Sequence, residues 1–445
     1  MREQTDFALP LFAERLDGKR SRRGRAAHCR TASLPACALA VGFGVLSLGA
    51  AGETPLPLPP EPTRLYGALQ TEPERAAAGR EIGWRVAVIA VSWDRFEPEV
   101  GRFDEKYIEG VATTKTKLRA LGYKLQLDLG VQYPPAWVFS SANSRYRDQF
   151  GDAFASKQAG ENLPNVVFNA EVRKRVAGYV RAVFVRLGSD WDFVRLGGGK
   201  FGELNFPGPN FNGRTNCYWA FDDLAQGKST GLPEGMRACP VPGWIPGASS
   251  ADHRSAKKFI EWYLDSLENY QDWQIATVRR WYSGDLCLLY GSWGLRPGWL
   301  DAAVAKDLSG DTPAERNGEL QQGFDWARMI GGIRDPRTIV YCTWVDGTIG
   351  NRDLADDEST DPARWSPVHW QASLARSNPL HLRVWGENTG HNNRAAMKLS
   401  FDRVKRFDLM GLMWAFDAEL FAQPNPHGFA TFADFAGLIL DTRGR

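Results

Sequence analysis

The stretch "WDFVRLGGGKFGELNFPGPN", residues 191–210, joins an apolar run of β type to a loop rich in turn formers. The run 191–197 leads into three consecutive glycines, and Glu203 follows shortly before two prolines. Glycine lets the backbone turn sharply, and proline stiffens it. This stretch therefore predicts a strand that ends in a tight loop carrying one carboxylate.

Seven more runs of this kind alternate with amphipathic segments along the chain. The eight expected strands are 64–70, 84–93, 123–131, 191–197, 285–291, 338–344, 381–386 and 408–414. Helical periodicity is clear in 169–187 and 255–280. Eight strand–helix units predict an α/β fold, a closed (β/α)8 TIM barrel in one domain, with a long loop after the fourth strand. A doubly wound sheet gives a similar alternation, but no glycine-rich dinucleotide fingerprint follows the first strand.

The first 63 residues have a different composition. A basic cluster, "KRSRRGR", precedes the apolar, small-residue run "SLPACALAVGFGVLSLGAAG". This order predicts a secretory signal over 1–52, with a twin-arginine export signal as one form of it, and a secreted or periplasmic protein. A membrane anchor is the alternative, but the run is short and glycine-rich for a spanning helix. A Pro-rich linker, 53–63, then leads into a catalytic barrel over 64–445.

Charge and composition narrow the possible partners. The 445 residues carry a net charge of +2, and the predicted signal alone carries +4, so the remainder carries −2. Such a body lacks the basic footprint that nucleic-acid binding requires. The chain has no CxxC or HExxH motif, and its six His residues are scattered, so we expect no metal and no cofactor. We also expect no stable membrane insertion once the signal is removed.

The cysteines outside the signal fall into two pairs. Cys217 and Cys239 flank the expected long loop, and an exported protein could join them in a disulfide. Cys287 and Cys342 lie in apolar runs and indicate ordinary buried thiols.

A second carboxylate follows a second strand. The stretch "HLRVWGENTGHNN", residues 381–393, places Glu387 directly after the seventh strand and behind a glycine. Because the active site of such a barrel lies where the strands end, Glu203 and Glu387 are predicted to face one another across the mouth. Two facing carboxylates suit glycosidic bond cleavage, in which one is a general acid and the other a nucleophile or general base. Phe206 and Trp385 are expected to exclude water from the pair.

Further candidates lie near the strand ends. Six tryptophans can stack on sugar rings or simply fill the core: Trp93, Trp137, Trp293, Trp344, Trp385 and Trp414. Asn205 and Asn388 can hydrogen-bond sugar hydroxyls or cap turns, and Asp346 is a possible third acid of the site. Glu97, in an "FEPE" turn, is expected to be structural.

Two families share motifs with the chain. Residues 91–137 resemble family 42 glycoside hydrolases of the β-galactosidase type, in the pattern W-x-x-x-E-P-x-x-G-x-F-D that begins at Trp93 and in the "PPAW" that ends at Trp137. "GKFGELNFPG" and "RVWGENTG" resemble β-amylases, family 14, in which the corresponding glutamates are the general acid and the general base. The resemblance implies a (β/α)8 barrel, a carbohydrate substrate, and catalytic roles for Glu203 and Glu387.

The chain also departs from both families. Family 42 enzymes place Asn before the acid, where this chain has Gly202, and the loop of β-amylases after strand three is replaced by "GVQYPPAW". The strand-eight arginine of β-amylases is replaced near Trp414. The family 42 resemblance implies retention of the anomeric configuration and the β-amylase resemblance implies inversion, so both stay open. A carbohydrate-binding protein that has kept the barrel without turnover is the alternative function.

Overall fold

The structure is a computed structural model whose described residues are 64–347, 355–390, 392–422 and 429–443. The barrel lies within the unit Pro62–Arg445. The predicted secretory signal, 1–52, and the predicted linker, 53–63, lie outside the described residues.

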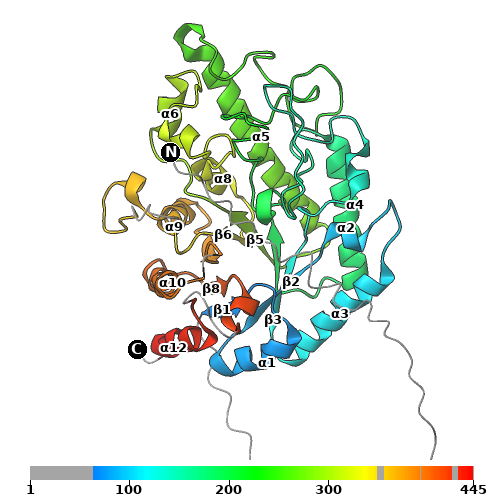
Figure 1. The fold of residues 1–445 in the computed structure, drawn as a ribbon, viewed down its shortest axis with the longest axis vertical. Helices are drawn as coiled ribbons and strands as arrows, with labels where there is room; N and C mark the ends of the chain where they lie inside the picture. Colours follow the sequence, from blue (N-terminus) through cyan, green and yellow to red (C-terminus); the bar gives the residue numbers. More distant parts are fainter. Residues whose placement is uncertain (1–63, 348–354, 391, 423–428, 444–445) are drawn as a thin grey trace, which may run out of the picture. The chain divides into compact units, whose positions relative to one another are not determined.

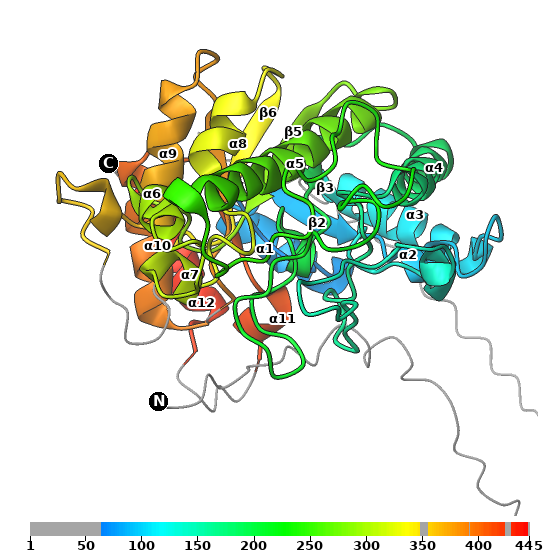
Figure 2. The same ribbon diagram turned by 90° about the horizontal axis from the view of Figure 1, so that it is seen from above.

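Eight parallel strands form one sheet that follows the order of the chain, with β8 beside β1. The strands are β1 (Leu65–Ala68), β2 (Val86–Ala90), β3 (Lys124–Asp128), β4 (Phe193–Leu196), β5 (Asp285–Tyr290), β6 (Thr338–Cys342), β7 (Arg383–Gly386) and β8 (Gly411–Trp414). A backbone hydrogen bond from Met410 N–H to Val384 O, 2.8 Å, and a bridge between Glu387 and Met413 connect β7 to β8. The predicted (β/α)8 barrel is confirmed, and each of the eight strands falls within its predicted run (Figures 1 and 2).

Alternation along each strand divides the side chains between two cores. In β4, Phe193 belongs to the cluster that fills the barrel, whereas Val194 and Leu196 belong to the larger cluster between sheet and helices. The cluster inside the barrel consists of Leu69, Val86, Val88, Phe193, Cys287, Leu289, Ile339, Tyr341, Trp385, Met413 and Ala415. The lower part of the barrel is therefore a packed apolar core, which leaves polar chemistry to the strand ends.

Helices surround the sheet (Figure 2). In the described residues they are α1 (Pro73–Ile82), α2 (Trp93–Phe96), α3 (Glu105–Ala120), α4 (Ala170–Leu187), α5 (Arg254–Arg279), α6 (Trp299–Val304), α7 (Pro313–Arg316), α8 (Trp326–Gly332), α9 (Pro367–Ser377), α10 (Arg394–Arg406), α11 (Asp417–Leu420) and α12 (Phe432–Arg443). Asn169 caps α4 by accepting the N–H groups of Glu171 and Val172, a contact worth about 1 kcal/mol. Within the described part of the chain, no helix has the length and apolarity needed to cross a membrane.

The connection from β4 to α5 is a long irregular segment that packs along α5 (Figure 1). Aromatic side chains hold it in place: Phe206 stacks on Tyr263 of α5 with ring centroids 4.2 Å apart, and Tyr218 meets the same ring edge-on at 5.6 Å. Cys217 and Cys239 are buried free thiols, so the disulfide left open by the sequence is not formed. Cys287 and Cys342 are buried thiols, as expected.

Candidate active site

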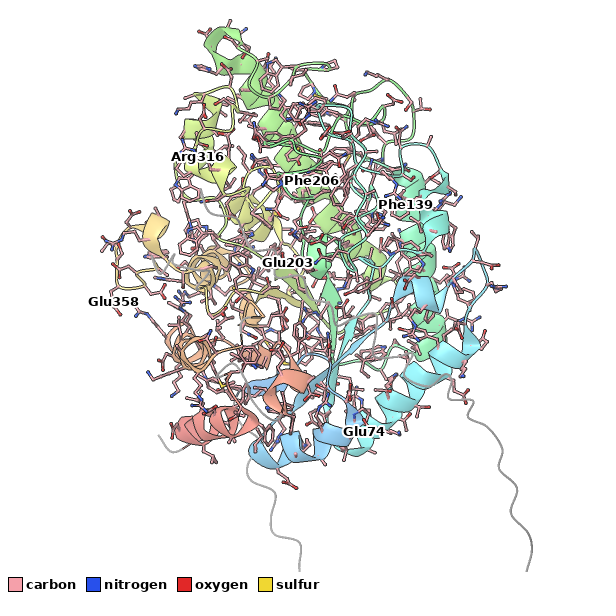
Figure 3. All side chains as sticks on the ribbon, in the orientation of Figure 1. Glu74, Phe139, Glu203, Phe206, Arg316 and Glu358 are labelled. Carbon is pink, nitrogen blue, oxygen red and sulfur yellow. The ribbon has the colours of Figure 1, made fainter. Side chains whose placement is uncertain are left out.

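A tight glycine turn after β4 positions Glu203. The turn folds back on itself, since Gly199 N–H donates to Glu203 O at 2.7 Å and Gly198 N–H donates to Gly202 O at 3.2 Å. A Cβ atom at Gly197 would lie 2.0 Å from Gly202 O, so only glycine fits there. The turn brings Glu203 to the center of the molecule, at the carboxyl ends of the strands (Figure 3).

The Glu203 carboxyl group is held between β5 and β6. Thr343 Oγ1 donates to Oε1 at 2.6 Å, and Asn205 Nδ2 donates to Oε2 at 3.2 Å. On the β5 side the carboxyl carbon occupies the space over Gly291, where a Cβ atom would lie 2.1 Å away. Burial raises the pKa of Glu203 to about 7; the Thr343 hydrogen bond opposes this shift, and the charge of Glu387 adds to it.

Glu387, at the end of β7, has the opposite surroundings. Arg195 of β4 donates from both guanidinium NH groups to the two carboxylate oxygens, at 2.8 and 3.2 Å, and Tyr341 of β6 donates to Oε2 at 2.9 Å. Glu387 is 7% exposed, and its backbone N–H donates to Cys342 O at 2.8 Å. A forked, charge-assisted pair of this kind fixes both the position and the orientation of the carboxylate.

Arg195 is the cation of the barrel interior. Its guanidinium lies 4.9 Å from the center of the Tyr341 ring, and its Nε lies 3.8 Å from an oxygen of Asp128 at the end of β3. Burial alone lowers the pKa of Arg195, but the charge of Glu387, together with Tyr341, the Glu387 hydrogen bond and Asp128, more than offsets this, so the pKa lies above the ordinary value. The guanidinium is therefore charged at any pH at which the protein is folded.

Strand β6 brings the two glutamates to one site. Tyr341 contacts Glu387 and Thr343 contacts Glu203, and these two residues are two positions apart on the same side of the strand. The charge of Glu387 is also among the causes that raise the pKa of Glu203. The structure thus brings the two predicted catalytic carboxylates together at the barrel mouth.

Another buried carboxylate, that of Glu319, holds the loop after β5. It accepts hydrogen bonds from Ser292 Oγ at 2.6 Å, Gly294 N–H at 2.7 Å and Trp293 N–H at 3.3 Å. Burial raises the pKa of Glu319, and its charge also acts on Glu203. Glu319 was not among the predicted site residues, because it lies in a turn after α7, far along the chain from any strand end that carries a motif.

Of the other predicted site residues, Asn205 contacts one of the carboxylates, and two tryptophans are half-buried in the loops after β5 and β6. Asn205 contacts Glu203 directly, and its Oδ1 also accepts Lys200 N–H at 2.8 Å, which fixes the amide orientation. Trp344 follows Thr343 and is half-buried. Trp293 is half-buried in the loop that Glu319 holds, with the Arg296 guanidinium 5.1 Å from its ring center.

Trp93, Trp385 and Trp414 have no exposed surface, so their prediction as sugar-stacking platforms is wrong. Trp385 points into the barrel below Glu387 and packs on Phe193 at 4.9 Å. Trp414 lies in the core between the sheet and the helices, with Phe435 at 6.4 Å.

The "FEPE" turn also has a structural role. Trp93 stacks on Tyr179 at 4.8 Å and donates its indole N–H to Glu97 at 3.2 Å. Trp137 is half-buried, donates to the Glu97 carbonyl at 3.0 Å, and meets the Trp93 ring edge-on. Trp137 thus packs on the turn while its sugar-binding role stays a prediction, and the structural role expected for Glu97 agrees with its contacts.

Asp346 and Asn388 brace the loops rather than line the site. Asp346 is fully buried and accepts Thr389 N–H and Thr389 Oγ1, both at 2.9 Å, which joins the loop after β6 to the loop after β7. Asn388 is buried and accepts Ala415 N–H at 2.7 Å, which joins β7 to the end of β8. The prediction that Asp346 and Asn388 contact substrate is therefore wrong. Both side chains are buried, and they position the loops on either side of Glu387.

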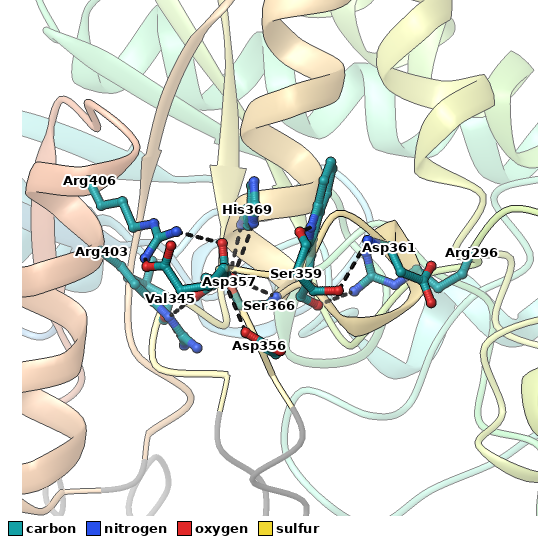
Figure 4. A network of polar contacts seen from close by, with 12 residues as sticks. Arg296, Val345, Asp356, Asp357, Ser359, Asp361, Ser366, His369, Arg403 and Arg406 are labelled. Carbon is teal, nitrogen blue, oxygen red and sulfur yellow. Dashed lines mark hydrogen bonds and ion pairs between the residues drawn. The ribbon is translucent and has the colours of Figure 1, made fainter.

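A polar network anchors the chain that follows the β6 loop (Figure 4). Asp357 accepts Ser366 N–H at 2.9 Å and Arg403 Nε at 3.1 Å, and lies 3.3 Å from His369 Nδ1. Burial alone would raise the pKa of Asp357, but its contacts with His369 and Arg403 hold the pKa well below the usual value. Arg403 also donates to Val345 O at 2.9 Å, so the network holds the residue that precedes Asp346.

No set of three or more His, Cys, Asp or Glu side chains in the described residues is placed to hold a metal ion. The main functional residue that the sequence analysis missed is Arg195. Its signal was present, because a buried charge in an apolar strand needs a partner, and Arg195 lies two residues after Phe193 and so faces the barrel interior with it.

The chain matches solved structures, although no profile of a known protein family and no curated protein matches it by sequence. The catalytic domain of β-amylase from Paenibacillus polymyxa aligns over 85% of this chain and 98% of that domain, at 16% identity and a TM-score of 0.60. The fold is the one seen in that glycosidase. β-Galactosidases from the psychrophilic Marinomonas ef1 and from Halorubrum lacusprofundi align over 85% of this chain, at 13% and 15% identity and TM-scores of 0.54 and 0.53.

These matches include both kinds of enzyme that the sequence motifs resemble. This chain covers 58% of each β-galactosidase, so it spans little more than half of their length. At these identities the likeness is one of fold, namely the (β/α)8 barrel.

Proposed function

We propose that the protein is a glycoside hydrolase that cleaves O-glycosidic bonds of an oligo- or polysaccharide. Glu203 is the general acid, and Glu387 is the nucleophile or general base. The observation that carries the proposal is the contrast between the two carboxyl groups. Glu203 is desolvated and has no hydrogen-bonded cation among the described residues, whereas Glu387 is paired with Arg195. A contrast of this kind separates an acid from a base at one site.

Glu203 has the properties of a proton donor. A pKa of about 7 keeps a large fraction of the carboxyl protonated at neutral pH, and Thr343 and Asn205 hold its two oxygens in place. In the reaction the bond between the anomeric carbon and the glycosidic oxygen breaks. The leaving oxygen takes the Glu203 proton as it departs.

Glu387 supplies the negative charge on the other side of the anomeric carbon. As a nucleophile it forms a glycosyl ester, which water later cleaves while returning a proton to Glu203. As a base it takes a proton from the water that attacks the anomeric carbon directly. Arg195 and Tyr341 orient the carboxylate in both cases.

The test is hydrolysis of a panel of aryl glycosides and oligosaccharides by the wild type and by Glu203→Gln, Glu387→Gln and Glu97→Gln. Glu97 is the matched control, since it is also a buried, hydrogen-bonded glutamate but contacts Trp93 and Gly101 instead of the pair. We expect the first two variants to lose at least about 100-fold in turnover and the third to keep most of it. Full activity in both pair variants would place the catalytic acids elsewhere.

The same panel separates hydrolysis from binding. Sugar binding measured by calorimetry with no turnover on any substrate would favor the carbohydrate-binding protein instead. Where turnover is found, NMR of the first-formed product anomer assigns Glu387 as nucleophile, if the configuration is retained, or as base, if it is inverted.

We also propose that residues 1–52 direct export to the periplasm or the medium. The support is the order of basic cluster, apolar run and small residues. Expression of the full chain and of a chain lacking 1–52, followed by cell fractionation and mass spectrometry of the N-terminus, tests this. An uncleaved, retained full chain would overturn it.

A further inference from the structure

One aromatic side chain in the β4 turn is not explained by packing. Phe201 lies two residues before Glu203 and is 44% exposed. It is among the few large apolar side chains of the described residues with this much exposure, whereas Phe206, three residues after Glu203, is fully buried. An exposed ring beside the candidate acid calls for a reason other than the core.

The backbone at Phe201 is unfavorable for a bulky residue. Its φ is 57° and its ψ is 19°, in the left-handed region, which costs a non-glycine residue roughly 1–2 kcal/mol. Neighboring contacts impose this conformation, because Phe201 N–H donates to Gly160 O at 3.0 Å and Glu203 N–H donates to Lys200 O at 3.1 Å. Glycine would adopt the same turn without strain. The chain carries phenylalanine at a position where glycine suits the fold better.

The ring lies among residues of the loops that follow β3 and β4. Lys200 Nζ lies 4.9 Å from the ring center and is paired with Glu161 at 2.9 Å. Phe201 and Tyr133 both border Gly160, since a Cβ atom there would lie 3.7 Å from the first ring and 3.5 Å from the second. Gly202, between Phe201 and Glu203, lies against Gln132, which places the turn over the end of β3.

The geometry points to Phe201 as the platform for the leaving group of the substrate. A general acid delivers its proton to the glycosidic oxygen, so the group attached to that oxygen departs on the side of Glu203. Phe201 shares the turn with Glu203 and presents an aromatic surface on which the apolar face of a sugar ring can stack. The ligand class is a saccharide unit, or another leaving group with a flat apolar face. This assignment rests on the proposed hydrolase function.

The test compares two substrates that differ only in the leaving group. An oligosaccharide has a sugar to place on Phe201, whereas the corresponding glycosyl fluoride has only a fluorine atom. We expect Phe201→Gly to lower the ratio of kcat/KM on the oligosaccharide to kcat/KM on the fluoride by about 10-fold or more. Its Tm should stay the same or rise, because the left-handed strain is removed.

Phe150→Gly is the matched control. Phe150 is 46% exposed with Arg214 5.1 Å from its ring center, so it has nearly the same exposure and a similar cationic neighbor. Its substitution should leave the ratio within about twofold of the wild-type value. Phe201→Leu keeps apolar bulk without an aromatic face, and should also lower the ratio.

The outcomes separate this inference from the proposed function. If the wild type hydrolyzes neither substrate, or if Glu203→Gln and Glu387→Gln keep full activity, the hydrolase assignment fails. If the wild type hydrolyzes both but Phe201→Gly leaves the ratio unchanged, or if Phe150→Gly lowers it equally, the platform assignment alone fails.

Discussion

The β4 and β7 sides of the barrel mouth carry the same side chain in opposite surroundings. On the β4 side, Glu203 receives hydrogen bonds from a hydroxyl and an amide, and no cation of the described residues is in hydrogen-bond contact with it. On the β7 side, Glu387 has the forked pair with Arg195 and the Tyr341 hydroxyl. Arg195 itself belongs to β4, yet it reaches across the interior to Glu387 instead of toward Glu203, which follows its own strand.

This difference shows how one barrel can give two glutamates opposite surroundings. Desolvation favors the neutral form of a carboxyl group, whereas a forked guanidinium contact is made by the charged form. The two sides are also coupled, since the charge of Glu387 helps to raise the pKa of Glu203. Substitutions that remove one of these groups at a time test the contrast.

The largest expected effect comes from removing the cation. Arg195→Met leaves the Glu387 carboxylate buried without its partner, which should cost about 3–5 kcal/mol of unfolding free energy. Turnover should fall by about 100-fold or more, because the carboxylate is no longer oriented. Urea denaturation and steady-state kinetics measure the two effects.

The double variant Arg195→Met/Glu387→Gln distinguishes the charge from simple packing. It should recover much of the lost stability while remaining inactive, because no unpaired charge is left buried. A double variant no more stable than Arg195→Met would show that the guanidinium acts through its packing alone.

The second prediction separates the two carboxyl groups by their chemistry. Glu203→Gln should lower kcat/KM by about 100- to 10,000-fold on oligosaccharides, whose leaving oxygen needs a proton. On dinitrophenyl glycosides, whose leaving group departs without protonation, the loss should be within about tenfold. Glu387→Gln should lose activity on both substrates. Equal losses on both substrates in the Glu203 variant would contradict its role as the acid.

The third prediction concerns the pH profile. Because Glu203 must be protonated and its pKa is about 7, kcat/KM should fall above that pH, by about tenfold per pH unit. Thr343→Val removes the hydrogen bond that lowers this pKa, so the alkaline limb should move to higher pH. Ser400→Ala removes a buried hydroxyl of α10 that donates to Ala396 O, and serves as the comparison. A limb that does not move in Thr343→Val would assign the titration to another group.

The smallest expected effect is on stability. The folded state holds the Glu203 proton up to a pH of about 7, whereas the unfolded chain releases it near the ordinary value of 4.5. Between these values the folded state binds more protons than the unfolded state, so Glu203 lowers stability as the pH rises. Glu203→Gln should therefore stabilize the protein by about 1 kcal/mol at pH 8 and less at pH 5. Thermal unfolding at both values checks the sign, and Glu387→Gln should show no such gain.

The tryptophans show where inference from sequence failed. All six were candidates because they lie near strand ends, but the direction of a ring depends on its exact position in the strand and on what packs there. Trp385 is two residues before Glu387, so it faces the same interior one layer lower, where it fills the core. Trp414 is adjacent to Met413 and so faces the helices instead. Position near a strand end did not distinguish these cases.

The sequence by itself determined the repeat of strand and helix and the two glutamates that follow β4 and β7. These are local features, since apolar runs, glycine turns and acids behind them are readable within a few residues. Only the tertiary structure decided which groups surround each glutamate. Arg195 and Glu387 are 192 positions apart in the chain and Thr343 and Glu203 are 140 apart. Barrel closure brings these partners together, and the partners give the two carboxyl groups their different surroundings.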